Sequence, residues 1–129
     1  ENKVKELVVS KNVFVTDDFS QAMKVGDLLY LSGITARNEK GEILEKDFEA
    51  QTVRIFKNIE SILKEAGAVL DDVIKFTVYL KDINNLGKFR ELRNQFFSAP
   101  RPPSTAVEVT GLVPGAIVEV EVIVDCGKR

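Results

Sequence analysis

The sequence predicts an α+β fold, a two-layer sandwich in which two helices cover one face of a mostly antiparallel, six-stranded sheet. Stretches in which apolar and polar residues alternate indicate strands, and two stretches with apolar residues three or four positions apart indicate helices. Their order is strands, helix, strand, helix and two strands. Two helices of this size can cover only one face of such a sheet, which makes two layers the natural result.

The first third of the chain is predicted to form short strands. Residues 5–9 and 13–15 are rich in β-branched side chains, as strands usually are. The stretch QAMKVGDLLYLSG is predicted to be two strands joined at Val25, Gly26 and Asp27, a turn signal between two apolar runs.

Two helices are predicted from their periodicity. The first begins at Phe48, with Asp47 as its N-cap and Gly67 just past its end. The second spans residues 85–97, and the prolines at 100, 102 and 103 end it. The apolar stripe of this second helix consists of Leu86, Phe89, Leu92 and Phe96.

Three further strands are predicted at residues 72–80, 105–109 and 116–124. Alternate residues of a strand point to opposite faces. In the first of these strands the face turned to the helices is Ile74, Phe76, Val78 and Leu80. In the last it is Val118, Val120, Val122 and Val124, with Ile117, Glu119, Glu121 and Ile123 on the other face. The same alternation places Thr105, Val107 and Val109 in the core. It places Ser104, Ala106 and Glu108 on the face of the glutamates.

The face that carries the glutamates therefore combines carboxylates with large apolar side chains, among them Ile117, Ile123 and Tyr79. A solvated face seldom keeps so many apolar groups together, and a buried face does not leave carboxylates without partners. Both conditions are met if the face lies against a second subunit with a polar cleft between them. The simpler alternative is an ordinary solvated face, and the pattern alone leaves both open.

Composition excludes several kinds of chemistry. The sequence of 129 residues has no histidine and one cysteine, Cys126, which removes Ser-His-Asp and Cys-His catalysis and argues against a metal site. The net charge of −2, without a cluster of basic residues, argues against nucleic acid as a partner. No apolar run reaches the roughly 20 residues of a membrane span, and no signal peptide is visible. We expect one domain over residues 1–129, a cytoplasmic location, no membrane contact and no cofactor.

Three segments give the chain a resemblance to a known family. These segments are FSQAMKVGDLLYLSG, the long stretch QTVRIFKNIESILKEAGAVLDDVIKFTVYLKDINNL, and RPPSTAVEV followed by VEVEVIV. In order and spacing they resemble the Rid (YjgF) family of reactive intermediate imine deaminases. The resemblance implies the chorismate-mutase-like YjgF fold. It also implies a homotrimer that binds a small-molecule ligand in each intersubunit cleft.

The resemblance also implies roles for particular residues. Glu119 matches the glutamate thought to position or activate the attacking water, and Phe19, Gly33, Ser104 and Ala106 match substrate-binding positions. Ser104 stands where the deaminases have an arginine that binds the substrate carboxylate. Arg90 and Arg101 are candidates for a compensating cation. With no cation identified opposite Glu119, we expect a substrate without a free carboxylate.

Three functions remain open. The first is hydrolysis or deamination of imine or enamine intermediates with an altered substrate. The second is a non-catalytic small-molecule-binding or regulatory trimer, and the charge balance disfavours the third, an endoribonuclease or translation inhibitor. The sequence leaves undecided whether the chain is an enzyme.

Overall fold

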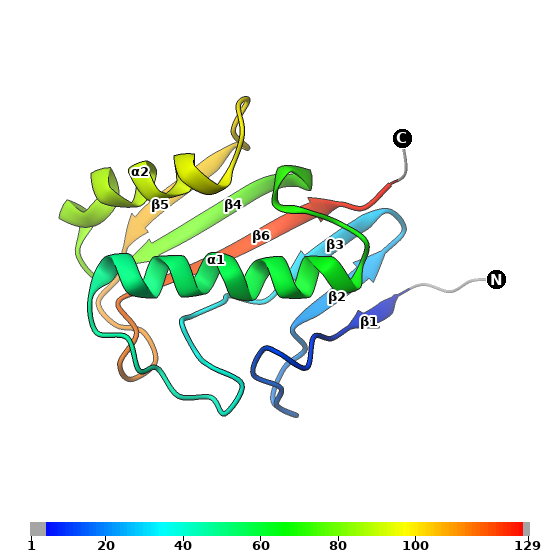
Figure 1. The fold of residues 1–129 in the computed structure, drawn as a ribbon, viewed down its shortest axis with the longest axis horizontal. Coiled ribbons are helices and arrows are strands. Elements are labelled where there is room, and N and C mark those ends of the chain that lie inside the picture. The colour runs from blue at the N-terminus through cyan, green and yellow to red at the C-terminus, as the bar shows by residue number, and fades with distance from the viewer. Residues whose placement is uncertain (1–4, 128–129) are drawn as a thin grey trace.

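The computed structural model describes residues 5–127 and contains one sheet of six strands (Figure 1). Along the sheet the order is β1-β2-β3-β6-β4-β5. Only β4 and β5 are parallel, and all the other neighbouring strands are antiparallel. The strands are β1 (Glu6–Val8), β2 (Ala22–Val25), β3 (Leu28–Leu31), β4 (Val73–Leu80), β5 (Ser104–Glu108) and β6 (Val118–Asp125). The predicted α+β class and the mostly antiparallel sheet are confirmed.

Two α-helices lie across one face of this sheet, as Figure 1 shows. Helix α1 (Phe48–Glu65) begins as predicted, because the Asp47 carboxylate accepts a hydrogen bond of 2.7 Å from the Ala50 N–H. Gly67, with φ of 73°, follows its end. Helix α2 (Leu86–Phe96) follows the short 3-10 turn η2 (Ile83–Asn85), and a second 3-10 turn, η1 (Leu70–Asp72), precedes β4. No helix among the described residues is long and apolar enough to cross a membrane.

The core fills the space between the helices and the sheet. Phe56 of α1 lies at its centre, with ring centroids 5.8 Å from Phe89, 5.0 Å from Phe96 and 5.5 Å from Phe97. The even-numbered valines of β6 are buried beneath the helices, as their alternation predicts. Burial of these rings and branched side chains is the main force that holds the two layers together.

Two strand predictions are wrong. Residues 13–15 form no strand, because the side-chain amide of Gln21 binds the backbone carbonyls of Val13 and Phe14 in place of a neighbouring strand. In β4 the register shifts between Val73 and Lys75, so Val73 is buried and Ile74 is 43% exposed. Such a bulge reverses the face to which the residues before it point.

The predicted orientation of β5 is also wrong. In its parallel pairing with β4, Ala106 lies opposite the buried Val78, and Val107 lies opposite Tyr79. Paired residues of neighbouring strands share a face. Ser104, Ala106 and Glu108 are therefore on the helix side, and Val107, 38% exposed, is on the side of Glu119. Ala106 is small enough to pack against the edge of the core.

The face of the sheet that the two helices leave uncovered has the mixed character expected. Tyr79 pairs with Glu119, and Tyr30, which is 45% exposed, pairs with Ile123. The hydroxyl of Tyr79 donates a short hydrogen bond to Glu121. This face thus carries aromatic, aliphatic and acidic groups side by side.

Candidate functional site

The candidate site is built around Glu119, near the start of β6. Its side chain lies against the backbone of Gly33, in the segment that follows β3. A Cβ atom at position 33 would lie 1.9 Å from Glu119 Oε2 and 2.8 Å from its Cδ. Only glycine leaves space for the carboxylate in this position. The approach is fixed by two backbone hydrogen bonds between Ile34 and Val120, of 2.8 and 3.0 Å.

Glu119 forms one wall of a surface hollow of about 290 Å³, which we call the Glu119 hollow. Its walls come from four separate parts of the chain, namely the segment before β2, the segment after β3, the loop before β6, and β6 itself. The lining residues are Phe19, Ser32, Gly33, Thr35, Arg37, Val113 and Glu119. A hollow of this size is at the small end of ligand sites and suits a small molecule.

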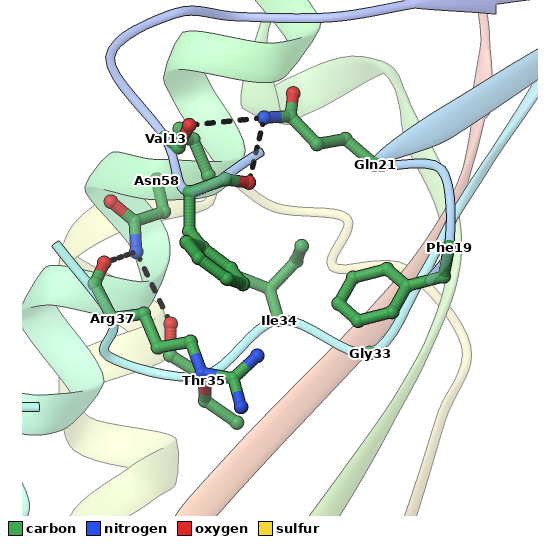
Figure 2. Close-up of a pocket in the computed structure, with 9 residues that line it drawn as sticks. Val13, Phe19, Gln21, Gly33, Ile34, Thr35, Arg37 and Asn58 are labelled. Atoms are coloured by element: carbon green, nitrogen blue, oxygen red, sulfur yellow. Dashed lines mark hydrogen bonds between the residues drawn. The ribbon is translucent and has the colours of Figure 1, made fainter. Parts of the chain in front are cut away.

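A second, apolar pocket adjoins the Glu119 hollow and shares Phe19, Gly33, Thr35 and Arg37 with it (Figure 2). In Figure 2 the Phe19 ring points toward the segment from Gly33 to Thr35, and the Arg37 side chain lies along the same segment. Phe19 is 44% exposed, so its ring is a free apolar wall rather than part of the core.

Two buried amide side chains hold the segments that line these pockets. Asn58 of α1 donates from its Nδ2 to the backbone carbonyls of Thr35 at 3.1 Å and Arg37 at 2.9 Å (Figure 2). Gln21 accepts from the Ser10 N–H at 2.8 Å and donates to the carbonyl of Phe14 at 3.0 Å. Buried polar groups with all their partners present rigidify the backbone around them. The walls of the site are therefore formed before any ligand binds.

Arg37 is the cation of the Glu119 hollow. Its guanidinium carbon lies 5.0 Å from the centre of the Phe14 ring, within the range of cation–π contacts. The same ring is packed on Gly41, where a Cβ would come within 2.7 Å of it. Gly41 has φ of 85°, a conformation that glycine adopts without strain. Phe14 is thus held in place as a platform for Arg37.

The electrostatic environment makes Glu119 a weaker acid. Burial raises the pKa of Glu119, the nearby charge of Glu121 raises it further, and the positive charge of Arg37 partly opposes both effects. Glu121 itself is bound by the Tyr79 hydroxyl, and that hydrogen bond is the largest cause of the raised pKa of Tyr79. No hydrogen bond to the Glu119 carboxylate occurs among residues 5–127. Glu119 is therefore available to exchange a proton with a bound molecule.

The predicted site residues fall into two groups. Phe19, Gly33 and Glu119 line the same hollow. Ser104 and Ala106 lie on β5, on the opposite face of the sheet and two strands away, and within one chain they do not line it. That a second subunit brings Ser104 and Ala106 to a Glu119 carboxylate stays a prediction.

The predicted compensating cations are also separate from the hollow. Arg90 and Arg101 are close to Arg93, whose pKa is lowered first by burial and then by the positive charges of Arg101 and Arg90. Neither Arg90 nor Arg101 lines the Glu119 hollow. Their predicted role as compensating cations in an assembled oligomer stays a prediction.

Sequence reasoning missed Arg37. The premise that no cation lies opposite Glu119 is wrong, because Arg37 lines the same hollow and influences the Glu119 carboxylate electrostatically. The available signal was weak: Arg37, four residues after Gly33, is one of several charged residues in a loop without periodicity. The described residues contain no group of three or more acidic, cysteine or histidine side chains arranged to hold a metal ion.

Comparison with known proteins places this site in context. Residues 10–126 match the family model described as endoribonuclease L-PSP. A RutC family protein of Pyrococcus abyssi is 44% identical over 106 residues, which cover 81% of this chain and 84% of the relative. The chloroplastic Reactive Intermediate Deaminase A of Arabidopsis thaliana is 34% identical over 125 residues, covering 95% of this chain and 67% of that protein.

A solved structure agrees with the fold. The crystal structure of a Yersinia pestis protein, described as a protein of unknown function of the conserved Rid family, has a TM-score of 0.90 and 34% identity. The match covers 95% of this chain and 99% of that chain. The likeness therefore extends over the whole of both layers.

Proposed function

We propose that this chain, which belongs to the endoribonuclease L-PSP (YjgF/Rid) family, hydrolyses the C=N bond of small imine intermediates, including the imines formed when enamines tautomerise. The observation that carries the proposal is the carboxylate of Glu119, which has a raised pKa, lies in a hollow of small-molecule size and accepts no other hydrogen bond among the described residues. A relative named as a deaminase, 34% identical, gives further support.

The chemistry requires one proton acceptor that also returns the proton. Water attacks the carbon of the protonated C=N bond, and Glu119 takes a proton from that water, which gives a neutral carbinolamine. The same carboxyl group then returns the proton to the nitrogen, the C–N bond breaks to release ammonia, and the hydroxyl proton passes to the Glu119 carboxylate as the C=O bond forms. The products are a carbonyl compound and ammonia. A carboxylate with a pKa moved toward neutrality suits both steps, and such catalysis typically contributes about 10²- to 10⁴-fold in rate.

The substrate is proposed to be held differently from that of family members with an arginine at the position of Ser104. Ser104 offers a hydroxyl, and within one chain it lies on the face of the sheet opposite Glu119. A guanidinium makes two parallel charge-assisted hydrogen bonds with a carboxylate, which a hydroxyl does not reproduce. The substrate must then be held by other groups.

We also propose that the working form is a homotrimer with the open face of the sheet turned inward. Support comes from the apolar groups on that face, including Tyr30 and Ile123, which remain partly accessible in the single chain. Burial of such groups against a partner is favourable by about 25 cal/mol per Å² of apolar surface. Sedimentation or light scattering that gives a monomer at micromolar concentration would contradict this part of the proposal.

The test is release of ammonia from imines generated in situ by an amino-acid oxidase. We expect the wild type to accelerate it and Glu119→Gln to lose about 10²- to 10⁴-fold. Glu60→Gln is the matched control, since Glu60 is an exposed residue of α1. Full activity of Glu119→Gln would refute the proposed role. Ligand-dependent stabilisation without turnover would instead favour a non-catalytic binding or regulatory trimer.

A further inference from the structure

We propose that Arg37 binds the carboxylate of the substrate, so that the site takes small imino or enamino acids despite Ser104. This inference rests on the proposed function, and it names the substrate class of the same site. It replaces the expectation of a carboxylate-free substrate, whose premise was the lack of a cation near Glu119.

The guanidinium of Arg37 has unused hydrogen-bonding capacity. A guanidinium carries five N–H donors. Within residues 5–127, Arg37 has no side-chain hydrogen bond and no ion pair, and its one described contact is with the Phe14 ring. By contrast, Arg54 pairs with Glu45 and Arg93 donates to Asn94. The donors of Arg37 are therefore free for an anion that enters the hollow.

The positive charge of Arg37 is held in place before a ligand arrives. The ring of Phe14 supports the guanidinium from one side, and Asn58 fixes the backbone carbonyl of Arg37. A cation with a fixed platform loses little conformational entropy on binding, which favours the planar, bidentate recognition of a carboxylate.

The charges of the site also match those of the proposed substrate. Arg37 and Glu119 line the same hollow, yet the described residues include no ion pair between them. A protonated imino acid carries a carboxylate and a positive C=N group a short distance apart. Such a molecule lies between the two side chains with its carboxylate on Arg37 and its reacting C=N group beside Glu119. Hydrolysis adds water, releases ammonia and leaves a 2-oxo acid whose carboxylate stays on Arg37.

The experiment compares two imines that differ in the carboxylate. One is made from alanine by an amino-acid oxidase, and the other from a primary amine by an amine oxidase. The proteins are the wild type, Arg37→Met, Arg37→Lys and Arg101→Met. Arg54→Met is the matched control, because Arg54 lies on α1 with its own acidic partner.

For the imine that carries a carboxylate, we expect Arg37→Met to lower kcat/KM by roughly ten- to a hundredfold, mainly through KM. For the imine that lacks a carboxylate we expect a much smaller change, because the substitution then removes only the electrostatic effect of Arg37 on Glu119. Arg37→Lys should restore part of the loss, and Arg54→Met should behave as the wild type. Equal kcat/KM of the wild type and Arg37→Met for the imine with a carboxylate would overturn the inference. A selective loss in Arg101→Met alone would overturn it in favour of the other cation.

A binding measurement separates this inference from the proposed function. Calorimetry with pyruvate, the 2-oxo acid formed from the alanine-derived imine, reports carboxylate binding without turnover. If no protein releases ammonia but pyruvate binding disappears in Arg37→Met, the proposed function fails and Arg37 remains the carboxylate site. If the wild type neither binds pyruvate nor prefers the imine that carries a carboxylate, the inference about Arg37 is wrong.

Discussion

Replacement of Gly33 by alanine tests how closely the position of Glu119 is tied to the backbone beneath it. The added Cβ would lie 1.9 Å from Oε2, where a normal contact needs more than 3.0 Å. The carboxylate must therefore move by roughly 1 Å or more. The atom in the way is the far end of a flexible side chain, and Gly33 does not have a positive φ, so the backbone accepts alanine without strain.

A shift of that size should have a small effect on stability and a large effect on the rate of catalysis. Misplacement of a reacting group by about 1 Å costs roughly a hundredfold in rate. We therefore expect Gly33→Ala to lower kcat/KM for imine hydrolysis by about that factor, while Tm changes by no more than a few degrees. The assay is ammonia release, with Tm followed by circular dichroism. Gly111→Ala is the matched control, since it has no atom within 4 Å of the added Cβ and no positive φ.

A double variant identifies the cause of the loss. If Gly33→Ala acts by moving Glu119, it should add almost nothing to the loss already produced by Glu119→Gln, because the two changes affect one group. Wild-type turnover in Gly33→Ala would refute the geometric argument. A full additional loss in the Glu119→Gln background would show that Gly33 matters for another reason.

Three further variants test separate parts of the structure. Glu121→Gln removes a negative charge that raises the pKa of Glu119. The acid limb of the pH profile of kcat/KM, where Glu119 becomes protonated, should therefore move to lower pH. An acid limb at the wild-type pH would contradict this. Asn58→Ala leaves the backbone carbonyls of Thr35 and Arg37 without their donor, which should cost about 1–3 kcal/mol in urea denaturation and raise KM for the imine with a carboxylate. Phe56→Ala removes a fully buried ring and should cost about 3–5 kcal/mol in the same measurement, and a loss under 1 kcal/mol would show that the core is packed differently.

The sequence predicted those features that depend on strong periodicity. The valines of β6 alternate over eight residues, so the face of Glu119 was determined without knowledge of the fold. The apolar stripe and the Asp47 cap located α1 in the same way. Burial of one complete face makes the pattern unambiguous in such elements, because a shift of one residue would expose every valine.

The errors occurred where burial is weak or irregular. Strand β5 lies at the edge of the sheet, and its five residues are only partly buried or exposed, so alternation alone does not decide between Ala106 and Val107 for the helix side. The bulge in β4 changed the face of Ile74 without any glycine or proline to signal it. Both are local differences of a few side chains, which tertiary packing decides.

Arg37 could not be identified from the sequence for a different reason. Its loop has no repeating pattern, and its position depends on Asn58, 21 residues further along the chain. The platform beneath it depends on Phe14, whose backbone is held by Gln21, and on Gly41. These contacts join four segments that only the folded chain brings together. A cation in such a loop is recognised as part of a site only when the hollow it faces is known.

A crystal structure of the protein with a 2-oxo acid bound would show directly whether Arg37 and Glu119 form one site. The predicted result is a carboxylate held by the Arg37 guanidinium at about 2.7–2.9 Å, with the carbonyl carbon turned toward Glu119. A 2-oxo acid bound at Arg90 or Arg101 instead, or a Glu119 hollow left empty at saturating concentration, would contradict the account.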